Sequence, residues 1–107
     1  MIYELRIYEA MPGKMQALNQ RFANITMGYF EKHGIKSVGY WTEEIGTSNT
    51  LVYILAIDDL TQRERAWSAF REDDERAQLF AETEAEGPLV ARITNRILRP
   101  TDYSPMK

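Results

Sequence analysis

The pattern of hydrophobic and polar residues along the chain predicts four β-strands. Residues 2–8 read Ile-Tyr-Glu-Leu-Arg-Ile-Tyr, with large apolar side chains on either side of Glu4 and Arg6. The period of two is the signature of a strand. The other predicted strands are residues 35–45, 50–57 and 89–98. The stretch 50–57 is apolar on both faces, which is typical of a central strand that is covered on both sides.

A long helix is predicted between the first two strands, from Pro12 to about His33. Its apolar positions recur every three or four residues, which places them on one face. They are Met15, Leu18, Phe22, Ile25 and Tyr29. Pro12 suits the first turn of a helix, and Gly34 suits the left-handed residue that commonly ends one.

A second helical region is predicted between the third and fourth strands. Residues 61–64 read Thr-Gln-Arg-Glu, a capping box that would open a helix with Ala66, Trp67 and Phe70 on one side. Asp73-Asp74 would begin a second helical piece, which Gly87-Pro88 would end. Both Asp58-Asp59 and Asp73-Asp74 are interpreted as helix-entry residues rather than as a metal site.

The order β-α-β-β-α-β predicts an α+β, ferredoxin-like fold with a four-stranded antiparallel sheet. We expect one domain over residues 1–107, with a polar tail from about residue 100. In such a fold both helices cover the same face of the sheet. Because residues 50–57 are apolar on both faces, an apolar stripe remains on the bare face, and we expect a homodimer through it. The alternative is that the tail folds back over the sheet.

Composition and charge exclude several kinds of function. The 107 residues are 44% hydrophobic, carry a net charge of −3 and contain no cysteine and one histidine. Disulfides and thiolate or histidine-cluster metal sites are therefore excluded by count. The acidic balance argues against nucleic-acid binding, and no apolar run is long enough to cross a membrane. We expect a cytoplasmic protein that uses no cofactor.

Three segments together resemble the NIPSNAP family. They are residues 3–8 with Pro12-Gly13-Lys14, residues 38–46 with their Gly-Tyr-Trp-x-x-Glu-x-Gly run, and residues 98–101. The resemblance spans nearly the whole chain. It implies the dimeric α/β barrel group, in which two ferredoxin-like domains join their sheets. It implies no particular reaction, so whether the chain is an enzyme stays open.

Charged residues on the first and last strands form one candidate site. If even-numbered residues share a face, Glu4, Arg6 and Tyr8 lie beside Arg92 and Arg96. We then expect Glu4 to pair with Arg96 or Arg92, because a buried charge needs a partner, and Arg6 to stay available to an acidic ligand. The alternative, which we prefer, is a structural ion-pair network.

Aromatic residues form the second candidate site. Tyr40, Trp41, Tyr53 and Trp67 would enclose a flat apolar ligand between sheet and helix, or else simply form the core or the dimer interface. We prefer the second interpretation. His33 is the lone histidine and so a nominee for a general base, but a cationic ring that caps the preceding helix explains it without chemistry.

Two functions remain open from these patterns. One is a small-molecule protein with a pocket between sheet and helices, for which the ligand-binding candidates are Arg6, Tyr40, Trp41, Tyr53, Trp67 and Arg96. A monooxygenase- or isomerase-like enzyme without a cofactor is a variant of it. The other is a protein-interaction module with no catalytic activity.

Overall fold

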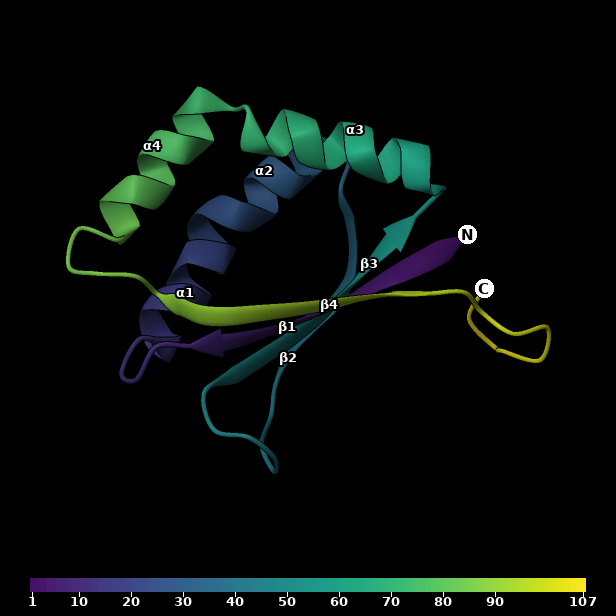
Figure 1. The fold of residues 1–107 in the computed structure, drawn as a ribbon, viewed down its shortest axis with the longest axis horizontal. Coiled ribbons are helices and arrows are strands. Elements are labelled where there is room, and N and C mark those ends of the chain that lie inside the picture. The colour runs from purple at the N-terminus through teal and green to yellow at the C-terminus, as the bar shows by residue number, and fades with distance from the viewer.

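The computed structural model describes residues 1–107 as a four-stranded sheet with all helices on one side of it (Figure 1). The strands are β1 (Ile2–Ala10), β2 (Lys36–Thr42), β3 (Thr50–Ile57) and β4 (Val90–Leu98). The helical elements are α1 (Met15–Arg21), the π-helical segment η1 (Phe22–Thr26), α2 (Met27–Lys32), α3 (Leu60–Arg71) and α4 (Asp74–Thr83). The predicted ferredoxin-like α+β fold is confirmed. No helix combines the length and the apolar character that crossing a lipid bilayer requires.

The strands lie in the order β2-β3-β1-β4, and all neighbours are antiparallel. β1 and β3 are therefore the central strands. Arg6, in the middle of β1, lies opposite Tyr53 of β3 and opposite Asn95 of β4. This register decides which side chains share a face of the sheet.

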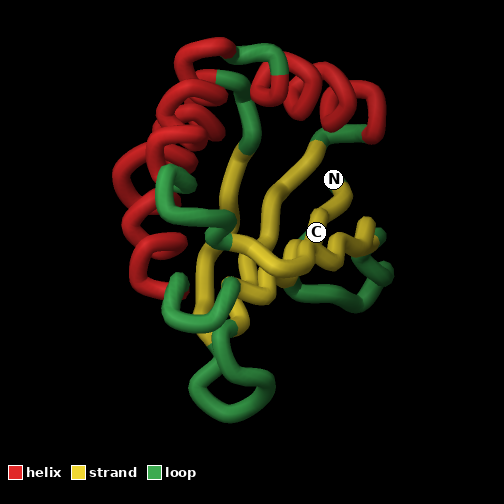
Figure 2. The backbone as a smooth tube through the Cα atoms, turned by 60° about the vertical axis from the view of Figure 1, so that its left-hand side comes forward, coloured by secondary structure: helices red, strands yellow, loops and turns green.

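The two faces of the sheet have different surroundings. Figure 2 shows the helices stacked against one face. On that face Tyr53, Leu55 and Ile57 of β3 are buried, whereas Val52 and Ile54 of the opposite face are only half-buried. The apolar stripe predicted for the bare face is therefore present.

The first helical stretch runs continuously from residue 15 to residue 32, but its middle is a π-helix. A π-turn holds one residue more than an α-turn and so rotates everything that follows. Leu18 and Phe22 are buried as predicted. From the end of the π-segment onwards, however, Thr26 and Phe30 are buried in place of the predicted Ile25 and Tyr29. The apolar spacing predicted the helix, but not the shift of its buried face by one residue.

The helix starts differ from two predictions. The first helix begins at Met15, after a turn, so Pro12 lies outside it. The predicted capping box at Thr61 is wrong: Asp59 is the N-cap of α3, and its Oδ1 accepts from the Gln62 amide at 2.8 Å. The Asp59 carboxylate, two residues upstream of Thr61, satisfies one of the free amides at the helix start, so the Thr61 hydroxyl is not needed as a cap. Asp73 caps α4 in the same way, and both aspartates are helix-entry residues as predicted.

Candidate functional site

Glu4 lies fully buried on the helix-facing side of β1, at the centre of a polar network. Arg63 of α3 grips its carboxylate, with Nε 2.8 Å from Oε1 and Nη2 3.0 Å from Oε2. Arg6 Nη1 donates to Oε2 at 2.8 Å, Asn95 Nδ2 donates to Oε2 at 3.1 Å, and Trp67 Nε1 donates to Oε1 at 3.3 Å. Five donors from two strands and one helix thus converge on a single buried carboxylate.

This network holds Glu4 in its ionised form. Burial by itself raises the pKa of a carboxyl group, because it disfavours the charged state. Here the hydrogen bonds from Arg63, Asn95 and Arg6 outweigh burial and bring the pKa of Glu4 down to about 2. Glu4 is therefore a fixed negative charge that locks β1 to α3 and β4, and it cannot serve as a base near neutral pH.

Arg6 carries the network on to two phenol groups. Its Nε donates to the Tyr53 hydroxyl at 2.8 Å, and its Nη2 lies 3.4 Å from the Tyr8 hydroxyl. Tyr53 in turn donates to Tyr8 at 2.9 Å. The guanidinium lies over the Trp67 ring, with Cζ 4.5 Å from its centroid, so a cation–π contact fixes its plane. Polar contacts therefore run from Glu4 through Arg6 and Tyr53 to Tyr8.

Tyr8 is also where this network reaches a small cavity between the helices and the sheet. The cavity has a volume of about 40 Å³. Its lining comes from β1, the first helical stretch, α3 and α4, and consists of Tyr8, Arg21, Phe22, Thr26, Phe30, Trp67, Phe70 and Phe80. By volume it has room for about three water-sized groups. The walls are mostly aromatic, and their polar residues are Tyr8, Arg21, Thr26 and Trp67.

Arg21 is a buried cation with few polar partners. Its side chain is 7% exposed, its Nη1 donates to Thr83 Oγ1 at 3.3 Å, and the nearest carboxylate oxygen, on Glu84, is 3.9 Å away. Its Nε is buried with no hydrogen-bond partner, and so is the hydroxyl oxygen of Thr26. Burial lowers the pKa of Arg21, and the charge on Glu84 offsets only part of that effect. Two neighbouring residues of the cavity wall thus have unused hydrogen-bonding capacity.

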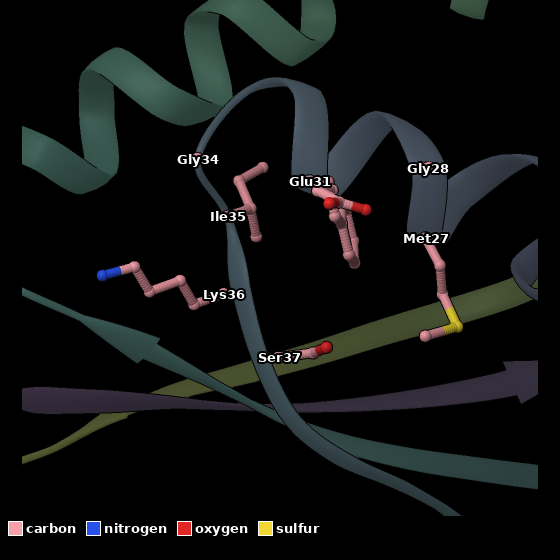
Figure 3. Close-up of a pocket in the computed structure, with 8 residues that line it drawn as sticks. Met27, Gly28, Glu31, Gly34, Ile35, Lys36 and Ser37 are labelled. Atoms are coloured by element: carbon pink, nitrogen blue, oxygen red, sulfur yellow. The ribbon is translucent and has the colours of Figure 1, made fainter.

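A larger hollow lies between α2 and the start of β2 (Figure 3). It is an open groove of about 540 Å³. Its charged residues, Glu31 and Lys36, are exposed to solvent, so water satisfies them. Because no buried polar atom there lacks a partner, the groove offers less reason for a ligand than the smaller cavity does.

The structure brings four of the six predicted ligand-binding residues together. Tyr40 stacks on Tyr53, with ring centroids 5.2 Å apart, and Arg6 and Trp67 contact the same cluster. The other two, Trp41 and Arg96, lie on the opposite face, where Trp41 pairs with Val52 of β3 and Arg96 pairs with Leu5 of β1. The six residues therefore do not line one pocket, and of them only Trp67 lines the small cavity.

The predicted partner of Glu4 is wrong. Glu4 lies opposite Ile97, an odd-numbered residue, so the register puts Arg92 and Arg96 on the other face of the sheet. Arg92 instead meets Glu9 there, with Nε 3.2 Å from Oε2. Glu4 pairs with Arg63 and Arg6, and Arg6 is thereby already engaged rather than available to a ligand. That a buried Glu4 would need an arginine was correct.

His33 is the C-cap of α2, the position predicted for it. Its side chain, however, turns to another helix: Nε2 lies 2.7 Å from Oδ2 of Asp73, the N-cap of α4. Lys32 Nζ donates to the same oxygen at 2.9 Å. His33 therefore links two helix ends, and it does not line the cavity.

The sequence did not predict the roles of the cavity residues Arg21 and Thr26 or of the partly buried cation Arg63. Arg21 follows Leu18 by three positions, and Arg63 precedes Trp67 by four, so each arginine lies on the apolar face of its helix. A charged residue at such a position signals a buried ion pair or a ligand contact. Thr26 offered no such signal, because it is buried only through the π-helical shift.

The chain is similar to several solved structures along its whole length. An uncharacterised NIPSNAP-like domain protein from Burkholderia xenovorans is 27% identical, with a TM-score of 0.85 over 97% of this chain and 88% of that one. A NIPSNAP family protein from Agrobacterium tumefaciens is 25% identical, with a TM-score of 0.88 over 99% and 98%. A putative antibiotic biosynthesis monooxygenase from Deinococcus radiodurans is only 10% identical, with a TM-score of 0.61 over 100% and 99%, which shows a shared fold alone.

No curated protein sequence matches the chain. The model of the NIPSNAP family, by contrast, matches residues 3–105, which is nearly the full length. The match includes the strand that carries Glu4 and Arg6 and the helices that line the cavity. The chain therefore belongs to the NIPSNAP family.

Proposed function

We propose that this protein binds a small molecule with a carboxylate group and a compact apolar body, in the cavity between its helices and its sheet. The observation that carries the proposal is the state of Arg21. It is a buried guanidinium whose Nε has no partner and whose nearest carboxylate oxygen is 3.9 Å away. A buried cation is unfavourable unless hydrogen bonds and an opposite charge compensate it. A carboxylate ligand would supply both.

The rest of the lining fits an anionic ligand. No Asp, Glu, Lys or His side chain lines the cavity, so Arg21 carries its only formal charge. Six of the eight lining residues are aromatic, which suits a short hydrocarbon body. Since no wall residue can accept a proton near neutral pH, the lining favours binding over proton abstraction. This speaks against the isomerase-like alternative.

A titration of the isotope-labelled protein followed by NMR tests the proposal. The probes are formate, acetate and propionate. We expect saturable shifts of the amide signals of Arg21, Thr26 and Phe80. Arg21→Met, which keeps the apolar stem of the side chain, should weaken binding at least about tenfold, the equivalent of about 1.4 kcal/mol. Arg71→Met removes an exposed arginine of α3 and serves as the matched control. Saturation by none of the three probes, or equal binding by Arg21→Met, would contradict the proposal.

We also propose that two copies pair through the bare face of the sheet. The support is the apolar surface of that face, where Trp41 is 52% exposed, Leu98 is 43% exposed and Ile54 of the central strand is half-buried. The C-terminal tail reaches part of this face, where Ser104 and Met106 line a hollow together with Tyr3 and Ile54. A second copy would cover the remainder and give the dimeric barrel that the family resemblance implies. The same surface supports the alternative of an interaction module.

A further inference from the structure

The direction of the hydrogen bond between the Tyr53 and Tyr8 hydroxyl groups limits the kinds of ligand that the cavity can bind. The Tyr53 side chain is fully buried, and its oxygen accepts from Arg6 Nε at 2.8 Å. Its own proton then needs an acceptor, and the Tyr8 oxygen, 2.9 Å away, is the one within reach. The opposite orientation would leave a buried proton on Tyr53 without a partner, which is unfavourable. Tyr53 therefore donates and Tyr8 accepts.

This leaves the proton of Tyr8 unused. The Tyr8 oxygen accepts from Tyr53 and lies 3.4 Å from a second donor, Arg6 Nη2. No group of the protein accepts the Tyr8 proton in return, and Tyr8 is part of the cavity wall. Arg21 lines the same cavity. A donor with its lone pairs occupied thus stands beside an under-paired cation.

The orientation of this donor is held from a distance. The hydrogen bonds from Arg6 to Tyr53 and from Tyr53 to Tyr8 form a relay, whose direction Arg6 determines. The position of Arg6 is itself fixed by Glu4 Oε2 at 2.8 Å and by the Trp67 ring. Arg6 and Tyr53 do not line the cavity. A ligand atom that meets Tyr8 therefore faces a hydroxyl that gives a proton and has little capacity to accept one.

We propose that Tyr8 donates to an ionised carboxylate oxygen of the ligand, and that Tyr53 is the positioning residue that fixes the direction of this donation. The inference rests on the proposed function and deepens it. It predicts that the site prefers a carboxylate to its neutral amide of equal size, because the amide offers N–H donors where the protein offers donors as well. The cavity volume of about 40 Å³ suits the carboxylate head of such a ligand.

The test compares acetate with acetamide in three variants, by the same NMR titration. The unmodified protein should prefer acetate at least about tenfold. Tyr8→Phe should keep only the part of that preference that Arg21 supplies, chiefly through weaker acetate binding. Tyr53→Phe frees the lone pair of Tyr8, so it should improve acetamide relative to acetate several-fold without removing any cavity contact. Tyr40→Phe, which alters a phenol stacked on Tyr53 but outside the relay, should keep the preference unchanged.

The outcomes separate this inference from the proposed function. If no probe binds the unmodified protein, the proposed function fails and takes the inference with it. If acetate binds and needs Arg21, but Tyr8→Phe keeps the full preference, only the inference fails. An unchanged acetate-to-acetamide ratio in a folded Tyr53→Phe would show that Tyr53 is merely structural. Should Tyr53→Phe not fold, the Tyr8→Phe ratio decides alone.

Discussion

Arg63 and Glu4 lie 59 positions apart in the chain and meet side-on in the core, with two hydrogen bonds of 2.8 and 3.0 Å between the guanidinium and the carboxylate. The pair fastens α3 to the central strand β1. It also holds the carboxylate that orients Arg6. The stability of the helix layer and the order of the phenol groups therefore depend on the same contact.

Glu4→Gln should lower the free energy of unfolding by roughly 3 kcal/mol or more, because it leaves two partly buried arginines without their anion. The double variant Glu4→Gln/Arg63→Met should lose less than the sum of the two single changes. Urea denaturation measures all four proteins. A Glu4→Gln variant as stable as the parent would contradict the structural role given to this pair.

The same carboxylate predicts a pH dependence. The pKa of Glu4 falls from 4.5 to about 2 on folding, so its stabilising effect is complete above about pH 4.5. The effect should be lost progressively as the pH falls from about 4.5 to about 2, by an amount on the order of 3 kcal/mol. In Glu4→Gln that part of the acid destabilisation should be missing. Parallel stability curves for parent and variant over this range would refute the assignment.

Thr26→Val should raise stability by about 1 kcal/mol, since it removes a buried hydroxyl that has no hydrogen-bond partner and keeps the shape of the side chain. If the cavity binds a carboxylate, the same change should weaken that binding. Urea midpoints and acetate titrations together check both halves. A variant that is less stable than the parent would mean that the hydroxyl is satisfied in solution.

Asp73→Asn should loosen α4 without removing its cap, because asparagine also caps helices well. The variant loses the carboxylate charge that binds Lys32 and His33. In the parent protein, the hydrogen bond from Lys32 is the main reason that the pKa of Asp73 lies well below its usual range. Amide hydrogen exchange in α4 should quicken, and the difference from the parent should shrink as acid protonates Asp73. Asp59→Asn is the matched control, since Asp59 caps α3 without a second helix. Equal effects on α3 and α4 would argue against the link.

Ile54→Lys should convert the proposed dimer into a folded monomer, since Ile54 lies half-buried on the bare face of a central strand. Sedimentation at micromolar concentration reports the mass, and circular dichroism checks the fold. Ala69→Lys places the same charge on the exposed side of α3 and should leave the dimer intact. A monomeric parent protein would rule out the pairing.

The periodicity of hydrophobic residues, together with the glycine, proline and aspartate residues that bound the elements, was enough to predict the strands, the helices and their order. They did not predict the pairing of Glu4, because the register of β4 against β1 cannot be read from either strand. β4 alternates Arg92, Thr94 and Arg96 with Ile93, Asn95 and Ile97, so each face contains polar residues and either parity is plausible. The deciding partner, Arg63, comes from a helix. Its contact depends on packing between layers and not on any local pattern.

The cavity could not be predicted from the sequence, for a related reason. Its unusual residues, Arg21 and Thr26, become neighbours of Tyr8 only when the first helical stretch packs on the sheet in one rotational setting. The spacing of apolar residues predicts which face of a regular α-helix packs on the sheet. It could not reveal a π-segment between Arg21 and Met27, which changes the setting halfway along.

The π-segment has a consequence for how this helix tolerates changes in length. Because a π-turn holds one residue more than an α-turn, a deletion of one residue within Phe22–Thr26 should leave a regular α-helix. The residues after the deletion would keep the same face toward the sheet, so Phe30 would stay buried. We therefore expect the shortened chain to fold with the same core. The additional residue is one that this helix can lose without losing its packing.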